Sequence, residues 1–179
     1  MLKEQDKLEY ERAAFWILAA LMVVAVILAI YLLPADLKQP VAGADAFGGK
    51  DALTVRVFFG NSRLDPEGLG DRVFAVERRI PKTPAVARCA LEELLEGPTD
   101  QETARDYFTS INPGVKIERL VIENGIAKVD FNEQLQAGVA GSCRVFAIRA
   151  QITQTLRQFP TIDDVIISIN GRTRDILQP

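Results

Sequence analysis

The stretch VKIERLVIENGIAKVDF, residues 115–131, decides the fold. Its two halves, residues 115–123 and 126–131, are rich in apolar and β-branched residues, and Asn124-Gly125 separates them. Asn-Gly between two such segments is the strongest short-range signal for a β-hairpin, because these residues accept the positive φ angles of a type I′ turn. The sequence therefore predicts an antiparallel pair of strands here.

Helical patterns lie on both sides of this hairpin. Residues 83–97 begin with Thr-Pro and end in a glycine that Pro98 follows, which suits the start and the end of a helix. A Thr and a Glu with capping-box spacing come next and predict a short second helix over residues 99–107. Residues 142–158 carry apolar residues three or four positions apart and predict a longer helix that stops before a proline.

Four further segments read as strands. Residues 53–59 alternate apolar and other residues, residues 72–80 are rich in β-forming residues, and residues 165–169 are strongly apolar. Asn170-Gly171 predicts a second hairpin into residues 172–177. The resulting order, β-β-α-α-β-β-α-β-β, predicts an α+β domain with helices packed on one face of a mainly antiparallel sheet.

Residues 13–33 form an unbroken run of 21 uncharged, mainly apolar residues. A helix needs about 20 such residues to cross a hydrocarbon core of about 30 Å, so the run predicts a transmembrane helix. A cleaved signal peptide fits less well, because its apolar region is typically about 7–15 residues long. A buried core helix is the remaining alternative.

The basic residues near this run predict its orientation. Three of them precede the run and two come closely after it: Lys3, Lys7 and Arg12 before, Lys38 and Lys50 after. By the positive-inside rule, residues 1–12 form a cytoplasmic tail and the domain of residues 53–179 lies outside. Residues 34–52 contain two prolines, three glycines and no sustained period, which predicts a flexible tether.

The composition excludes several classes of function. The net charge of −3 and the absence of a basic stripe argue against a nucleic-acid partner. The chain has no histidine, which removes Ser-His-Asp and Cys-His catalysis and the commonest ligand of transition metals. It also has no glycine-rich nucleotide-binding motif and no EF-hand spacing. We therefore expect no cofactor, no metal site and no small-molecule substrate.

A pair of carboxylates, as in glycoside hydrolysis, is the remaining route to catalysis. The candidates are Glu92, Glu93, Asp130, Asp163 and Asp164. Each has a simpler interpretation. The glutamates fit the exposed face of a helix, Asp130 fits a polar position in a strand, and Asp163 and Asp164 fit a loop that leads into a strand. The sequence therefore favours a protein without catalytic activity.

Two further pairs of residues are candidates for a role. Cys89 and Cys143 lie on the two main predicted helices and could form a disulfide outside the cell. Two buried free thiols are the preferred interpretation, because helix pairing does not guarantee the Cα separation that a disulfide needs. Arg78 and Arg79, near the end of a predicted strand, could bind a partner's carboxylate or phosphate or could be exposed charges at a sheet edge.

Several strings in the chain, in this order and spacing, resemble the sporulation and spore-germination domain family known as GerMN. The resemblance extends over residues 55–171. The strings are VERRIP (76–81), ALEELLEGP (90–98), INPG (111–114), NGIAKVDF (124–131), GS (141–142), TL (155–156), FP (159–160) and ING (169–171).

The resemblance implies a non-enzymatic domain of the bacterial cell envelope, with a fold similar to that of the ring-building motifs of envelope secretion complexes. Two features depart from the family. The chain has no lipobox cysteine, so the transmembrane helix would anchor it, and Arg144-Val145 stands where relatives often carry an acidic residue. The resemblance implies no catalytic residues in this chain.

We therefore expect a single-pass protein of the bacterial cytoplasmic membrane, with its N-terminus inside and its domain outside. The domain would bind an envelope protein or a second copy of itself. The alternatives are a module that binds cell-wall glycan or peptide and, less favoured, a carboxylate-dependent cell-wall hydrolase.

Overall fold

The computed structural model describes residues 22, 52–68 and 70–178. The predicted tail (1–12), transmembrane helix (13–33) and tether (34–52) lie outside this part, apart from residue 22 and Ala52, which opens the first strand. Among the described residues, no helix has the length and apolar character needed to cross a membrane. The elements are β1 (Ala52–Asn61), β2 (Phe74–Pro81), α2 (Val86–Glu96), α3 (Asp100–Thr103), β3 (Tyr107–Phe108), β4 (Ile117–Glu123), β5 (Ile126–Phe131), the 3₁₀ helix η2 (Glu133–Leu135), α4 (Ser142–Arg157) and β6 (Asp164–Ile169).

The α+β class is confirmed, but the strands form two three-stranded sheets and not one. The first sheet has the order β2-β1-β3 and is antiparallel throughout. The second has the order β4-β5-β6, with an antiparallel pair β4/β5 and a parallel pair β5/β6. The parallel pair results from the chain order, because α4 connects β5 to β6 and a helical crossover returns a strand in the same direction.

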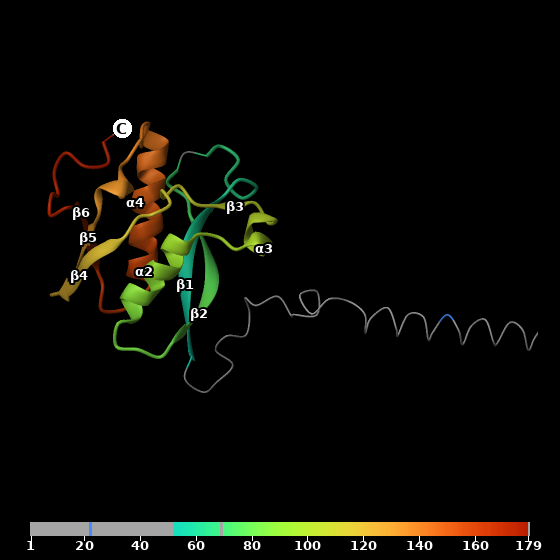
Figure 1. Ribbon diagram of the computed structural model, residues 1–179, viewed down its shortest axis with the longest axis horizontal. Coiled ribbons are helices and arrows are strands. Elements are labelled where there is room, and N and C mark those ends of the chain that lie inside the picture. The colour runs from blue at the N-terminus through green and yellow to red at the C-terminus, as the bar shows by residue number, and fades with distance from the viewer. Residues whose placement is uncertain (1–21, 23–51, 69, 179) are drawn as a thin grey trace, which may run out of the picture. The chain divides into compact units, whose positions relative to one another are not determined.

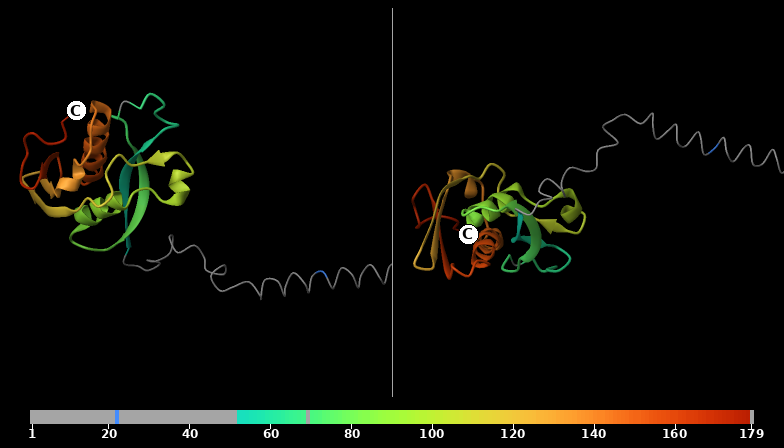
Figure 2. Two further views of the ribbon diagram at one scale, coloured as in Figure 1. Left: turned by 45° about the horizontal axis from the view of Figure 1, so that its top comes forward. Right: turned by 90° about the horizontal axis from the view of Figure 1, so that it is seen from below.

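Helix α4 lies between the two sheets, in contact with β1 and with β6 (Figures 1 and 2). The prediction of helices on one face of a single sheet is therefore wrong. The reason is visible in α4 itself, which buries a wide face that meets both sheets. Its buried residues are Val145, Ala147, Ile148, Gln151, Ile152, Thr155 and Leu156.

The core joins both sheets and both long helices. The predicted apolar face of the first strand is confirmed, since Val57 and Phe59 are fully buried and Val55 nearly so. The contributions of the other main elements are Leu91 and Leu94 from α2, Ile148, Ile152 and Leu156 from α4, Val129 and Phe131 from β5, and Ile167 and Ile169 from β6.

The end of the chain differs from the prediction. Asn170 and Gly171 do form a tight turn with positive φ angles, closed by two hydrogen bonds between Ile169 and Arg172. The strand expected over residues 172–177 is absent from the described structure, which has only a single bridge there. Asp175 and Leu177 have left-handed backbone conformations, which are incompatible with a continuous strand. The side chains of Ile176 and Leu177 are buried in the core.

The helix starts are partly as predicted. The capping box of α3 is present, with Thr99 and Glu102 each bonding to the other's backbone N–H. Helix α2 begins at Val86 and not at the predicted proline, because the Thr83 hydroxyl accepts the N–H of Ala85 in a turn before the helix. Helix α3 ends at Thr103, and the chain then forms the unpredicted strand β3 against β1.

Polar side chains near the C-terminal end of α4 cover the edge of β1 that β2 leaves open. The Gln158 side chain accepts the N–H of Arg56 at 2.7 Å and donates to its carbonyl at 2.6 Å. The Thr155 hydroxyl, fully buried, accepts the N–H of Phe58 at 3.2 Å. Because β3 pairs only with Gly60 and Asn61, these bonds occupy backbone groups of β1 that would otherwise lack a partner.

Candidate functional site: the outer face and free edge of the second sheet

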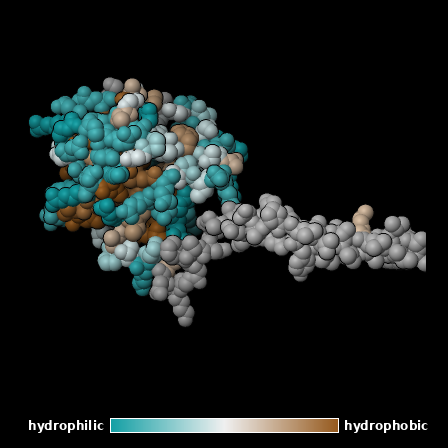
Figure 3. Space-filling model, in the orientation of Figure 1, coloured by the Kyte–Doolittle hydropathy of each residue, from teal (hydrophilic) through white to brown (hydrophobic). Residues whose placement is uncertain are grey.

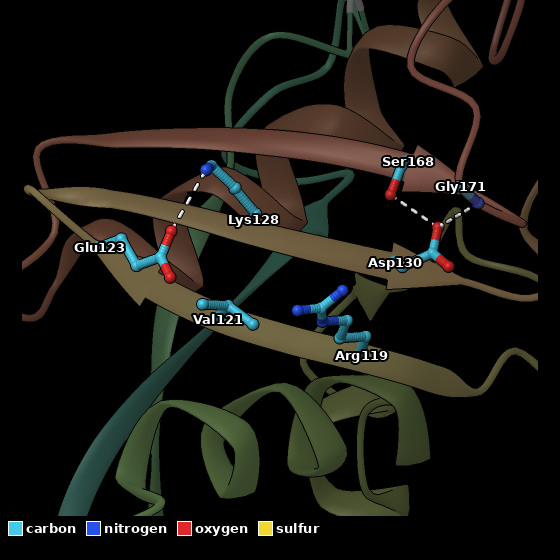
Figure 4. Close-up of a pocket in the computed structure, with 7 residues that line it drawn as sticks. All are labelled: Arg119, Val121, Glu123, Lys128, Asp130, Ser168 and Gly171. Carbon is cyan, nitrogen blue, oxygen red and sulfur yellow. Dashed lines mark hydrogen bonds and ion pairs between the residues drawn. The ribbon is translucent and has the colours of Figure 1, made fainter.

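The outer face of the second sheet carries the first candidate site, a shallow pocket of about 270 Å³ (Figure 4). Neighbouring strands supply its side chains, which point away from α4 because residues alternate between the two faces of a strand. The lining residues are Arg119, Val121 and Glu123 from β4, Lys128 and Asp130 from β5, Ser168 from β6, and Gly171.

Most polar groups of this pocket bind one another. One oxygen of Asp130 accepts the hydroxyl of Ser168 at 2.6 Å and the N–H of Gly171 at 2.8 Å (Figure 4). The ammonium of Lys128 lies 3.4 Å from the carboxylate of Glu123, in an exposed pair of little energy. Arg119 stands opposite Asp130 in the strand register, but its guanidinium makes no hydrogen bond or ion pair within the described residues.

The acidic candidates of the second sheet are held apart. Asp130 and Asp164 both belong to it, but Asp164 pairs with Ile126, four residues from Asp130 along β5. Four strand residues span about 13 Å, more than the roughly 5–9.5 Å that glycosidase carboxylates require. Asp163 lies at the same end as Asp164, where its N–H donates to the carbonyl of Gly125 at 2.7 Å.

The two glutamates of α2 have basic partners of their own. Glu92 accepts a hydrogen bond of 2.9 Å from Arg88, and Glu93 lies 3.5 Å from Arg78. Each of these two glutamates is therefore paired with an arginine.

Arg78 and Arg79 point to opposite faces of β2 and do not form a joint fork. Arg78 donates to both carboxylate oxygens of Glu102, one of them at 2.6 Å, and its guanidinium lies over the ring of Phe59 at 5.8 Å. Arg79 is exposed. Of the two arginines, only Arg79 has its side chain free for a partner.

The charges around Arg78 shift one another's pKa. The hydrogen bond to Glu102 raises the pKa of Arg78. Burial acts to raise the pKa of Glu102, but the hydrogen bonds from Arg78 and from the N–H of Thr99 outweigh it, and the pKa is lowered. Burial, followed by the charge of Glu96, raises the pKa of Glu93. Together these contacts tie β2 to α2 and α3.

Cys89 and Cys143 are free thiols near opposite ends of α4. Cys89 is half-buried in a small apolar cluster with Phe159, just beyond the C-terminal end of α4, and this burial raises the pKa of its thiol. Cys143 is exposed in the first turn of the helix, so the expectation of two buried thiols is wrong for this residue. A helix rises about 1.5 Å per residue, so roughly 24 Å separates positions 143 and 159, against the 7 Å or less between the Cα atoms of a disulfide.

No group of three Cys, Asp or Glu side chains in residues 52–68 and 70–178 could hold a metal ion. A metal site is therefore not among the functions that the geometry of this part of the chain suggests.

The second candidate site is the free edge of β4, beside a groove of about 450 Å³. Helix α2 and the start of β4 line this groove, and Arg88 of α2 donates to the carbonyl of Ile117 at 3.1 Å. Further along the strand the side chain of Ile122 is 40% exposed. Figure 3 shows a hydrophobic patch on the surface where Figure 1 places β4 and α2.

The apolar outer face of β4 was not predicted from the sequence, although a signal was present. Leu120, Val121 and Ile122 are three consecutive apolar residues, so both faces of β4 are apolar at this point. A strand with one solvated face normally alternates apolar and polar residues. The break in alternation therefore predicts apolar surface on the outer face of β4 as well as on its core face.

A family model described as "Germane: Sporulation and spore germination" matches residues 56–175. This range covers the strands and helices of the domain from β1 to β6, except the first residues of β1. The chain belongs to the Germane family. The GerMN resemblance deduced from the sequence is thereby confirmed. The family's description concerns sporulation and germination and does not name an enzyme class.

Solved structures agree with the Germane assignment at the level of the fold. The first GerMN domain of the sporulation protein GerM from Bacillus subtilis is 23% identical, with a TM-score of 0.53 over 68% of this chain and 85% of that one. The tandem GerMN domains of the same protein are 20% identical, with a TM-score of 0.56 over 75% of this chain and 44% of that one. No significant match was found among curated proteins.

Proposed function

We propose that this Germane protein is a non-enzymatic, membrane-anchored envelope protein. Its domain lies outside the cytoplasmic membrane and mediates protein–protein contact or assembly in sporulation, germination or cell-wall processes. The observation that carries the proposal is the free edge of β4 with its exposed Ile122, on a domain in which Asp130 and Asp164 do not form a catalytic pair.

The anchor is part of this proposal. The apolar run at residues 13–33 supports a transmembrane helix, and the basic residues before it support an N-terminus inside the cell. Tethering raises the effective concentration of a domain near other membrane proteins, so a small contact surface can suffice.

Cross-linking on intact cells tests this function. A membrane-impermeant lysine reagent should react with the exposed Lys82, Lys116 and Lys128, and mass spectrometry should identify an envelope protein or a second copy in the product. Reaction only after lysis would contradict the external location. Capture of cell-wall glycan or peptide in place of a protein would favour a cell-wall-binding module.

A chain that lacks residues 1–33 provides the matching control. If it is exported by another route and restores full activity in cells that lack the protein, the proposed role of tethering is wrong. Loss of activity with the fold intact, monitored by circular dichroism, would support it.

A further inference from the structure

Strand β4 presents two residues with their backbone groups directed away from the sheet. The turn at Asn124-Gly125 has positive φ angles at both residues, and Glu123 pairs with Ile126 directly beside it. In such a hairpin, alternate residues from Glu123 backward bond to β5, and those between them face outward. The N–H and C=O groups of Leu120 and Ile122 therefore point to the free edge and make no hydrogen bond within the described residues.

The other exposed edges are less suited to pairing. Strand β2 ends at Pro81, which has no N–H to donate, and carries charged residues at positions 77, 78 and 79. In β6, the N–H of Ile169 already bonds to the carbonyl of Arg172 and that of Val165 to the carboxylate of Asp164. Edges blunted in these ways resist association with another chain.

The sequence of β4 is complementary to itself when reversed. Residues 119–123 read Arg-Leu-Val-Ile-Glu, with a positive end, three apolar residues and a negative end. In an antiparallel pair of two copies centred on Val121, Leu120 stands opposite Ile122 of the second copy, with its outward backbone groups available for bonding. The same register places Arg119 opposite Glu123 of that copy, and directly opposed charges of unlike sign stabilise a strand pair.

We propose that two copies of this chain associate through their β4 edges, antiparallel and centred on Val121. The proposal names the partner for the protein–protein contact of the proposed function and so rests on that function. The two-fold axis makes every contact occur twice, as in an isologous dimer, and joins the two sheets into one of six strands. Arg119, whose guanidinium has no partner within one described chain, gains one in Glu123 of the second copy.

The inner face of the new strand pair is apolar. Ile122, 40% exposed in one chain, is covered in the pair by Leu120 of the second copy. A contact of about five residues per strand buries less than the roughly 1,200 Å² of a stable interface. The pairing should therefore be weak in dilute solution and favoured when both copies are confined to one membrane.

A cysteine at the centre of the pair tests the register. Val121 would face its own copy as a non-hydrogen-bonded pair, with a Cα separation of about 4.5 Å, inside the range for a disulfide. We would express the full chain with Cys89→Ala and Cys143→Ser, add Val121→Cys, and oxidise isolated membranes with copper phenanthroline. A disulfide-linked dimer on non-reducing gels is the expected result.

Lys128→Cys, in the same background, is the matched control. Lys128 is the partner of Val121 on β5, so it shares the outer face but lies one strand from the edge. In the proposed dimer the two copies of position 128 are three strand spacings apart, about 14 Å, and should not cross-link. Equal cross-linking of both variants, or of neither, would overturn the proposal.

Charge reversal provides a second test of the register. Arg119→Glu and Glu123→Arg, each added alone to the Val121→Cys chain, place like charges opposite one another and should reduce the rate of cross-linking roughly tenfold. The double variant restores opposite charges and should restore cross-linking. Failure of the double variant to recover, with the fold intact by circular dichroism, would overturn the register.

These outcomes separate this inference from the proposed function. Capture of a different envelope protein by the lysine reagent, with no Val121→Cys dimer, would refute pairing between copies and leave the interaction function standing. Absence of any captured protein in both experiments would contradict the two together.

Discussion

The open edges of β1 and β4 face the same physical problem and meet it in opposite ways. On β1, side chains at the end of α4 occupy the unpaired backbone groups, with Gln158 bonding to Arg56 and Thr155 to Phe58. On β4, the outward groups of Leu120 and Ile122 have no such cover among the described residues. The first edge belongs to the interior of the fold, and the second remains available to another molecule.

Stability of the fold and association with another molecule are therefore expected to depend on different edges of this domain. Ties on the first sheet hold β1 and β2 to the helices, so changes there should lower the free energy of unfolding. Changes at the edge of β4 should alter contact with a second copy and leave folding nearly as it is. A substitution in either region is therefore expected to affect one property and not the other.

The largest loss of stability is expected for Arg78→Ala. The guanidinium and the carboxylate of Glu102 have only 12% and 14% of their side-chain surface exposed. Removal of the guanidinium therefore leaves a nearly buried carboxylate that keeps the hydrogen bond from the N–H of Thr99 but has lost its charged partner. We expect the free energy of unfolding to fall by about 2–4 kcal/mol, measured by denaturant titration followed by circular dichroism.

Arg79→Ala is the matched control for that change. Arg79 is the next residue of β2 but is exposed on the opposite face, so its removal should alter stability by less than about 0.5 kcal/mol. Equal effects of the two substitutions would show that the contacts of Arg78 contribute little.

Thr155→Val should have the next largest effect. The substitution keeps the shape of the buried side chain but removes the oxygen that accepts the N–H of Phe58. An unsatisfied buried amide destabilises a protein by about 1–3 kcal/mol, and the same denaturant titration would measure it. Thr155→Ser retains the hydroxyl, so it should lose less stability than Thr155→Val if the hydrogen bond matters more than the methyl group.

The dependence of stability on pH gives a third, smaller effect. Because the folded state lowers the pKa of Glu102, its contribution is complete above the ordinary value of 4.5 and is lost as the pH falls through the lowered pKa. Glu102→Gln should therefore reduce the loss of stability below about pH 4.5, seen in melting temperatures measured at about pH 7, 5, 4 and 3. An unchanged acid profile would contradict a role for this carboxylate in acid unfolding.

Sequence patterns predicted the elements that depend on neighbouring residues. The Asn124-Gly125 hairpin, the α3 capping box and the bounds of α4 rest on local turn and helix chemistry, and the structure contains all three. The division into two sheets and the short strand β3 depend on contacts between distant segments, which periodicity does not encode. The strand expected after Asn170-Gly171 is missing because a turn signal specifies the turn and not the conformation of the next residues.

The candidate sites show the same limit. The arginine pair could be noticed in the sequence, but the alternation of β2 decides that Arg78 turns inward to Glu102 while Arg79 faces solvent. The charge pattern of residues 119–123 is also visible in the sequence. It indicates pairing between two copies only once β4 is known to be an edge strand. Edge position is a property of topology, and no local sequence pattern specifies it.

The smallest effect on stability, with a large effect on association, is expected for Ile122→Lys. Ile122 is 40% exposed, so the free energy of unfolding should change by less than about 1 kcal/mol. In the proposed pair, however, the lysine would lie on the apolar face opposite Leu120 of the second copy, and a charge at an edge strand opposes association. The Val121→Cys cross-link should be lost. Ile166→Lys, 37% exposed on β6 and away from this edge, should cross-link as before, and a similar loss in both variants would show that surface charge alone is responsible.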